Sequence, residues 1–347
     1  MYIKKILVAI ALIGVVVGGI IVYNIYNAIF APNTVFEEDR VFIEVPTNAG
    51  FSAVKAQLQP LLKDMSSFER VAQRKGYIGN IKAGRFPISK GMNNNEIVNS
   101  IRSRNIPLSL SFNNQESLGE LAGRISDQIE ADSVSLLKVF NDKEFLDSIN
   151  MNSDNAIGMY IPNTYEFFWN TDAEAFRDRM YKEYNKFWNE TRIGKAMQLG
   201  LTPKQVTALA AIVQKESAKV DERPRIAGVY INRIRKKMPL QADPTVIFAK
   251  KKLSGDFEQV IKRVLNADLQ LDSPYNTYKY AGIPPGPICM PDISSIDAVL
   301  NFEQHDYLYF VADTKNFGYH KFAKTLSQHN VNAKEYHQWI NAQGIRR

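Results

Sequence analysis

Cysteine and histidine are scarce in this 347-residue sequence, which has one cysteine and four histidines. The lone cysteine, Cys289, excludes an internal disulfide framework and any site built from several thiolates. Three of the histidines, His320, His329 and His337, are spaced nine and eight residues apart, which matches no familiar zinc-ligand pattern. There is also no glycine-rich phosphate loop and no internal repeat. We therefore expect neither a metal nor another cofactor.

Strongly basic segments are also missing. The 43 Lys and Arg residues exceed the 36 Asp and Glu residues by seven, but this excess is spread along the chain. The short basic run at 233–237 is typical of a solvated helix end, so we expect no nucleic-acid partner. The composition is 45% hydrophobic and 23% charged, which is ordinary for a globular protein and excludes a disordered or collagen-like chain. The length suggests two or three domains.

Only one long apolar run occurs, and it lies near the N-terminus. After Lys4 and Lys5 no charged residue appears between Ile6 and Phe30, and Ile6–Tyr23 is almost wholly apolar. Eighteen residues nearly cross a hydrocarbon core at about 1.5 Å each, and the following residues supply the rest. A cleaved signal peptide is the alternative, but the run is long for one and no A-x-A site follows it. We predict an uncleaved anchor at 1–30, crossing the cytoplasmic membrane once.

The two lysines place the N-terminus of that anchor in the cytoplasm, so the residues from about 32 onward lie outside it. Residues 31–40 have the composition of a short polar linker. Residues 41–106 alternate short strands and helices and predict a small α+β module. Its predicted elements are a strand at 41–46, a helix at 51–62, a helix opened by the capping box Ser66-x-x-Glu69, a strand at 81–89, and a helix opened by Asn93-x-x-Glu96.

The remaining residues, 107–347, predict a larger mixed domain. Alternation at 108–112 indicates a strand, and apolar residues at helical spacing indicate helices at 118–129 and 171–190, with two further helices before Asn152. The continuous apolar segment 307–311 predicts a buried strand. The predicted fold class is therefore α+β: a transmembrane helix, a small α+β module and a larger mixed α/β domain.

One glutamate gives the sharpest local signal. Thr202, Pro203 and Gln205 together form a capping box with proline at the first helical position, so a helix begins there. Its apolar stripe runs through Val206, Leu209, Ile212 and Val213, and Glu216 follows on the same face. Burial and the negative end of the helix both raise the pKa of such a carboxyl, as a group exchanging protons near neutrality requires.

A structural role for Glu216 is the alternative, in which the buried carboxylate pairs with Arg223, Arg225 or Arg233. Lys215 and Lys219 lie off the stripe and are interpreted as solvated.

Further polar segments follow this helix. Asp243 precedes Pro244, which is the pattern of a helix N-cap, and capping alone would explain it. The segment Tyr275-Asn276-Thr277-Tyr278 offers aromatic faces and an amide, a combination that suits sugars, although tyrosines often only pack. The proline-rich segment 283–288 suits the wall of a groove.

These segments occur in the order typical of the YceG-like family, the endolytic murein transglycosylases, which the chain resembles over most of 150–332. The matching stretches are GMYIPNTYEF (158–167), ALAAIVQKESAKVDERPRIAGVYINRI (208–234), LQADPTVIF (240–248), SPYNTYKYAGIPPGPICMP (273–291), YLYFVAD (307–313) and HKFAKTLSQHN (320–330). The family plan also includes an N-terminal span and a LysM-like module, which residues 41–106 resemble more loosely. Gln214 and Cys289 depart from the usual pattern, where an acid and a small residue are more common.

This resemblance implies that Glu216 is the catalytic residue of a peptidoglycan lytic transglycosylase. Such an enzyme cleaves the β-1,4 bond between N-acetylmuramic acid and N-acetylglucosamine and leaves a 1,6-anhydro end. It implies a bacterial protein whose catalytic domain faces the cell wall, acts on new glycan strands and associates with penicillin-binding synthases. From motif membership and polarity, the predicted glycan-binding residues are Asn163, Tyr165, Glu166, Gln241, Asp243, Asn276 and Tyr278.

Two rival functions stay open. A lysozyme-like muramidase would use Glu216 with a second acid, Asp243 or Glu166, and would consume water. A non-catalytic wall-binding scaffold would hold Glu216 in a salt bridge, unreachable from any groove.

Overall fold

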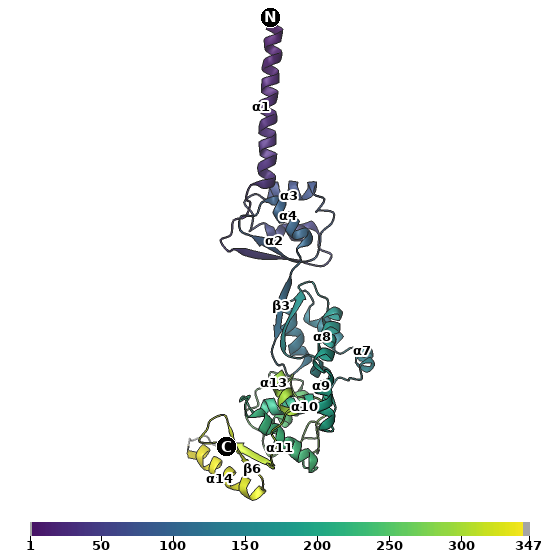
Figure 1. Cartoon of the computed structure of the whole chain (residues 1–347), viewed down its shortest axis with the longest axis vertical. Coiled ribbons are helices and arrows are strands. Elements are labelled where there is room, and N and C mark those ends of the chain that lie inside the picture. Colours follow the sequence, from purple (N-terminus) through teal and green to yellow (C-terminus); the bar gives the residue numbers. More distant parts are fainter. Residues whose placement is uncertain (1, 343–347) are drawn as a thin grey trace. The chain divides into compact units, whose positions relative to one another are not determined.

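The computed structural model describes residues 2–342 of the chain. It divides into two compact units, which are described separately (Figure 1). The first unit contains Met1–Leu110, Gln128–Ala131 and Tyr165–Asp172, and the second contains Ser111–Asp127, Asp132–Thr164 and Ala173–Arg347. Three two-stranded sheets and many helices in the described part of the chain make the architecture mixed α+β, as predicted.

The first unit begins with the long helix α1 (Tyr2–Phe30), which corresponds to the predicted apolar run. Within residues 2–342 it is the one helix long and apolar enough to cross a membrane. Its side chains are mostly exposed up to Tyr26, as expected for a surface that lipid would cover.

A small α+β module follows in the same unit. Its elements are β1 (Arg40–Val45), α2 (Phe51–Leu58), α3 (Met65–Arg74), β2 (Gly84–Ser89) and α4 (Asn94–Ser103). Strands β1 and β2 pair antiparallel, with Ile43 opposite Phe86, and both helices between them bury apolar residues against this pair. The predicted capping box of Asn93 and Glu96 is confirmed. The predicted cap of α3 is wrong by two positions, because the Asp64 carboxylate accepts the hydrogen bond from the Ser67 N–H.

The end of α1 is bonded to this module. The Asn94 amide donates to the Ala28 carbonyl at 2.8 Å and to the Ser67 hydroxyl at 2.9 Å, and its oxygen accepts from Asn33 at 2.7 Å. Ile29 packs against the core of the module. Asn33 itself is 5% exposed, so part of the segment predicted as a linker is buried and paired.

Two strands cross the boundary between the units: β3 (Pro107–Phe112) and β4 (Asn163–Phe168) form a two-stranded sheet. The predicted helices before Asn152 are confirmed as α6 (Ser133–Phe140) and α7 (Lys143–Ser148), after α5 (Leu118–Ser126). The helix predicted at 171–190 is shorter, α8 (Ala173–Phe187), because the Asn189 side chain caps a new helix, α9 (Glu190–Gln198).

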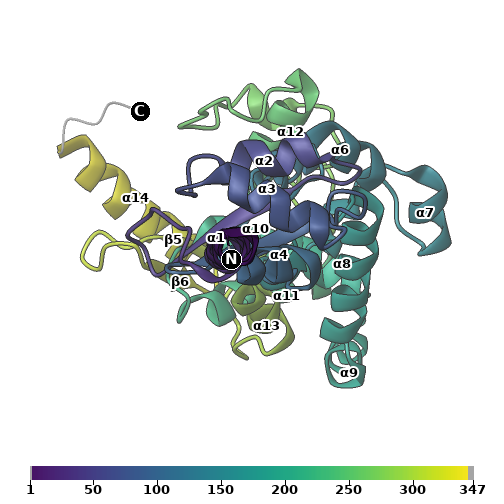
Figure 2. The ribbon, with the colours of Figure 1, turned by 90° about the horizontal axis from the view of Figure 1, so that it is seen from above.

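The core of the second unit surrounds α10 (Pro203–Glu216), which contacts α9, α11 (Arg223–Arg235), α12 (Asp243–Ser254), α13 (Ile293–Leu300) and the short helix η1 (Ala156–Met159). A further short helix, η2 (Asp268–Gln270), lies in the loop after α12. Strands β5 (Tyr309–Ala312) and β6 (His320–Ala323) pair antiparallel, and α14 (Leu326–Ala342) packs beside them (Figure 2). The strand predicted as fully buried is only half-buried, because among residues 2–342 no third strand joins this pair.

Candidate active site

Helix α10 begins as its sequence predicts. The Thr202 hydroxyl accepts a hydrogen bond from the Gln205 N–H, the Gln205 side chain accepts one from the Thr202 N–H, and Pro203 is the first helical residue. The predicted apolar stripe is buried, and so are all the residues from Val206 to Gln214. The helix is therefore covered on every side between its first and its last turn.

Glu216 is the last residue of α10, and its carboxyl lines a cavity of about 400 Å³. The next residue, Ser217, is extended, so the chain turns away at that point. The cavity is lined from α10, α11, α12, β5, α14 and two loops by Glu216, Tyr230, Arg233, Leu240, Gln241, Asp243, Tyr278, Tyr309, Phe310, Leu326 and His329. A ligand that enters this cavity can reach the carboxyl.

The surroundings of Glu216 favour its protonated form. Burial raises the pKa of Glu216 to about 7, and the nearby charge of Asp243 adds to this rise. A 2.7 Å hydrogen bond from the Tyr230 hydroxyl opposes the rise, as do the charges of His320 and Arg233. The carboxyl can therefore both give and take a proton near neutrality.

The structural alternative, a glutamate paired with arginine, is not observed. Arg225 pairs with Glu303 at 2.9 Å, and Arg223 donates to the main chain of the residue after Glu216. Arg233 is 7% exposed and donates to three main-chain carbonyls and to one side-chain amide. Within residues 2–342 none of the three forms an ion pair with Glu216.

Three of the predicted glycan-binding residues lie together at the cavity: Gln241, Asp243 and Tyr278. The Tyr278 hydroxyl donates to the Asp243 carboxylate at 2.5 Å, and the Gln241 side chain accepts from Arg233 at 3.2 Å. The expectation that Asp243 is an N-cap is wrong. Ala242 occupies the cap position, and the Asp243 carboxylate is directed to Tyr278 and not to the backbone of α12.

Asn276 lies outside the cavity lining and is fully buried. Its amide donates to the carbonyls of Leu269 and Leu271, and its oxygen accepts from the Tyr278 N–H at 3.1 Å. These bonds fix the loop that presents Tyr278.

The other three predicted residues also lie outside this lining. Asn163 is exposed at the start of β4, where its side chain accepts from the next N–H. Tyr165 and Glu166 belong to the first unit.

Several cavity residues were not predicted from the sequence. Tyr230 is 2% exposed and meets the Phe310 ring edge-on, with ring centroids 5.9 Å apart. The Tyr309 ring stacks on His329 at 5.2 Å. Tyr309 and Phe310 lie in the conspicuous YLYFVAD segment, but nothing local indicates that this strand reaches the end of α10.

A second unpredicted feature is the buried carboxylate of Glu222, which is 4% exposed. It accepts hydrogen bonds from the His320 N–H at 2.7 Å and from the Ser217 hydroxyl at 3.2 Å, and it lies 2.8 Å from His320 Nδ1. Glu222 therefore ties the segment after Glu216 to the start of β6.

Gln214, a departure from the usual family pattern, has a structural role. Its side-chain oxygen accepts from the Asp292 N–H at 2.5 Å and from the Ser295 hydroxyl at 3.1 Å, at the start of α13. Cys289 is buried against α10. Within the described part of the chain, no three His, Cys, Asp or Glu side chains gather as a metal site would require.

The fold and the site define a class: an α+β enzyme with a carboxyl of raised pKa in a cavity lined by tyrosines. The comparisons specify the family. The profile of the YceG-like family matches residues 43–335, and the chain belongs to this family.

Known relatives carry consistent names. The chain is 30% identical over 340 residues to the endolytic murein transglycosylase of Bacillus subtilis (strain 168), covering 92% of this chain and 91% of that protein. It is 32% identical over 179 residues to the endolytic murein transglycosylase of Streptococcus pneumoniae serotype 2 (strain D39), covering 52% of this chain and 32% of the longer streptococcal protein. A crystal structure of a yceG-like protein from Listeria monocytogenes is 29% identical, with a TM-score of 0.57, and the match covers 85% of this chain and 99% of that one.

Proposed function

We propose that this protein is an endolytic peptidoglycan lytic transglycosylase, a lyase that cuts the β-1,4 bond between N-acetylmuramic acid and N-acetylglucosamine. Membership of the YceG-like family and the names of its relatives support this activity. The observation that carries it is the Glu216 carboxyl, which lies in an accessible cavity with its pKa raised to about 7.

The reaction needs one proton carrier. The Glu216 carboxyl, in its protonated form, gives its proton to the bridging oxygen as the bond from that oxygen to C1 of the muramic acid breaks. The C6 hydroxyl of the same sugar attacks C1, and the Glu216 carboxylate takes the hydroxyl proton. The products are a 1,6-anhydro end and a free hydroxyl on the leaving sugar, so no water is consumed and Glu216 is restored.

A single carboxyl suffices because the nucleophile belongs to the substrate. A hydrolase needs a second acid as nucleophile or to activate water. Here the C6 hydroxyl is held beside C1, which gives it a high effective concentration. The substrate's N-acetyl oxygen stabilises positive charge at C1.

Glycan contacts in this proposal come first from Gln241, Asp243 and Tyr278, which lie with Glu216 in the cavity. The ring of Tyr278 offers a face for a sugar, and Gln241 and Asp243 offer hydrogen-bond partners for hydroxyl and N-acetyl groups. Asn276 contributes by fixing the Tyr278 loop. Asn163, Tyr165 and Glu166, which lie on β4, are further candidates for contacts with the glycan strand, outside the cavity.

The anchor is proposed to remain uncleaved, with its N-terminus in the cytoplasm and the rest of the chain outside the cytoplasmic membrane. The bonds of the module to Ala28 and the packing of Ile29 support an intact helix, because cleavage after this segment would remove a hydrogen-bond acceptor and an apolar side chain from the module. Lys4 and Lys5 support the orientation.

This placement favours internal cuts in newly made strands, close to the membrane-bound penicillin-binding synthases that make them. Cuts of this kind would end the elongation of those strands. The module at 41–106 is proposed to be LysM-like and to hold the strand, and a spacer of fixed height is the alternative.

The test is product analysis with uncrosslinked glycan strands. The full chain is expected to yield 1,6-anhydro ends, Glu216→Gln is expected to yield none while folding normally, and the exposed-site control Glu174→Gln is expected to match the wild type. Products with a reducing end, heavier by one water, would instead indicate a muramidase with Asp243 or Glu166 as second acid. Near-normal turnover by Glu216→Gln would refute the proposed role of this residue.

A further inference from the structure

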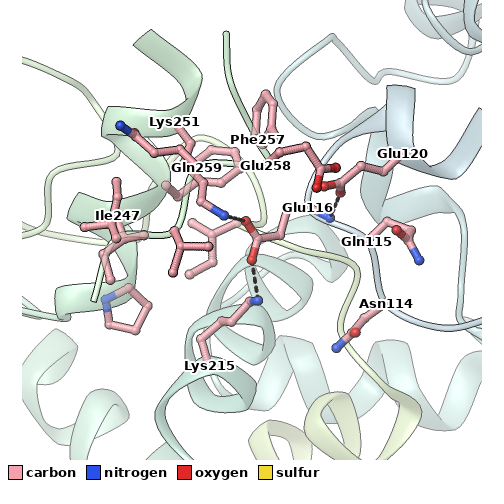
Figure 3. A pocket seen from close by; sticks show the side chains of 15 residues that line it. Asn114, Gln115, Glu116, Glu120, Lys215, Ile247, Lys251, Phe257, Glu258 and Gln259 are labelled. Carbon is pink, nitrogen blue, oxygen red and sulfur yellow. Dashed lines mark hydrogen bonds and ion pairs between the residues drawn. The ribbon is translucent and has the colours of Figure 1, made fainter. Parts of the chain in front are cut away.

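A second cavity of about 520 Å³ also lies at the end of α10 and the start of α12, and Figure 3 shows the side chains that line it. Two pairs of consecutive residues connect it to the cavity that contains Glu216: Lys215 lines the second cavity and Glu216 the first, and Pro244 lines the second and Asp243 the first. Both cavities are therefore bounded by the last turn of α10 and the first turn of α12, two helices that contact each other. The lining consists of Asn114, Gln115, Glu116, Glu120, Lys215, Pro244, Ile247, Phe248, Lys251, Phe257, Glu258, Gln259, Val260, Ile261 and Ile288.

Two lysines in the lining are both paired with the same carboxylate. The Glu116 carboxylate accepts from Lys215 at 2.5 Å through one oxygen and from Lys251 at 2.7 Å through the other (Figure 3). Lys215 is therefore paired, and not only solvated as its position off the stripe suggested. Each ammonium group has three N–H donors, and these bonds occupy one on each, so further donors can reach a carbonyl or carboxylate of a ligand.

The same cavity also contains two carboxylates that form no ion pair with a lysine among the described residues. Glu120 accepts from the N–H groups of Glu116 at 2.7 Å and Ser117 at 3.1 Å, and no lysine pairs with it among the described residues. The Glu258 side chain is exposed, and residues 2–342 supply it with no hydrogen bond or ion pair. With three acids and two lysines in the lining, the cavity favours a ligand that carries an amine.

Apolar side chains also line this cavity. Ile247, Val260 and Ile261 line it together with Phe257, which packs on the buried ring of Phe248. Neither tyrosine nor tryptophan lines this cavity, in contrast to the first one. The alkyl side chains of Ile247, Val260 and Ile261 suit short side chains such as the methyl group of alanine.

We propose that this second cavity binds the peptide stem of the muramic acid residue next to the scissile bond. This inference rests on the proposed function. A stem combines small side chains, amides, carboxylates and one free amine, and the cavity offers an alkyl wall, the side-chain amides of Asn114, Gln115 and Gln259, lysine donors and the Glu258 carboxylate. The stem is attached to the sugar and extends by about 3.3 Å per residue, so it is the part of the substrate suited to reach a cavity that shares the ends of α10 and α12 with the first one.

The first experiment compares two substrates: uncrosslinked strands that carry stems, and the same strands after an amidase has removed the stems. With the full chain in detergent, Glu258→Gln is expected to lower kcat/KM on stem-bearing strands by about tenfold, the loss expected for one hydrogen bond between charged groups, and to leave stripped strands unaffected. Acetylating the stem amine should lower the kcat/KM of the wild type by the same factor. It should leave the kcat/KM of Glu258→Gln unchanged. Equal losses on both substrates, or no loss on either, would overturn the inference.

Matched variants test the alkyl wall. Val260→Ser should weaken action on stem-bearing strands alone, whereas Val134→Ser, at a comparably exposed valine on α6, should change neither substrate; the two valines are 79% and 77% exposed. An equal effect on both substrates would instead indicate a sugar subsite and overturn the assignment.

Binding separates this inference from the proposed function. If the wild type forms no anhydro ends from either substrate, the proposed function fails, and calorimetry with the free stem pentapeptide then decides the second question. Saturable binding that Glu258→Gln weakens about tenfold would support the peptide site. Absent binding, or binding unchanged by the substitution, would overturn it.

Discussion

Replacing Glu216 with glutamine should change the pH dependence of stability in a specific direction. In the folded protein, burial raises the pKa of Glu216 from its ordinary 4.5 to about 7. Between these values the folded state binds more protons than the unfolded state, so stability falls as the pH rises. The cost is absent below pH 4.5 and complete above pH 7.

The magnitude follows from the same values. One pKa unit corresponds to about 1.4 kcal/mol, so a carboxyl raised from 4.5 to about 7 costs the folded state about 3 kcal/mol when it is ionised. Between pH 5 and pH 8 the wild type is expected to lose about 2 to 3 kcal/mol relative to Glu216→Gln. Glutamine can keep the hydrogen bond from Tyr230, because its side chain retains an acceptor oxygen.

Thermal unfolding of the full chain in detergent measures this difference. At pH 8 the melting temperature of Glu216→Gln should exceed that of the wild type by about 5 to 10 °C more than it does at pH 5. The exposed-site variant Glu174→Gln should track the wild type at both values. Parallel curves for wild type and Glu216→Gln would show that the carboxyl titrates normally, which would refute the claim that burial raises its pKa.

Three further changes have defined outcomes. Tyr230→Phe removes the hydrogen bond that lowers the pKa of Glu216, so the alkaline limb of kcat/KM for anhydro-end formation should move to higher pH, and a move to lower pH would contradict this assignment. Gly286→Ala would place a Cβ 1.8 Å from a main-chain carbonyl oxygen, so calorimetry should show a loss of about 1 to 3 kcal/mol; unchanged stability would show that the loop shifts freely. Asn94→Ala removes the amide that binds Ala28, and hydrogen exchange in the last turn of α1 should become faster, whereas unchanged protection would mean that packing alone fixes this turn.

Local chemistry made the end of α10 predictable. Capping by Thr202, proline at the first helical position and helical spacing of the apolar residues all act within a few residues. They were sufficient to place Glu216 on a buried face. Its partner Tyr230 belongs to another helix, and its hydrogen bond depends on how α10 and α11 pack, which no local pattern encodes.

Errors arose where a side chain had more than one use. Asp243 has the sequence context of a helix cap, but its carboxylate instead accepts a hydrogen bond from Tyr278, which lies in a loop far along the sequence. Ser66 forms a plausible capping box on paper, but Asp64 supplies the acceptor for α3. Lys215 lies off the apolar stripe, and only the folded chain brings Glu116 to it. In each case a contact between segments, or a competing neighbour, decided the outcome.

The hydrogen bond between Asn94 and Ala28 joins the anchor helix and the module, so that the two move together. A helix longer than the local hydrocarbon layer tilts. If α1 is embedded, its tilt also tilts the strands and helices of the module, because the last turn of α1 is hydrogen-bonded to the module and does not rotate independently. Membrane thickness would thereby set the orientation of the module, from β1 to the end of α4, relative to the membrane plane. A bilayer that thins or thickens would therefore reorient the module without any ligand having bound.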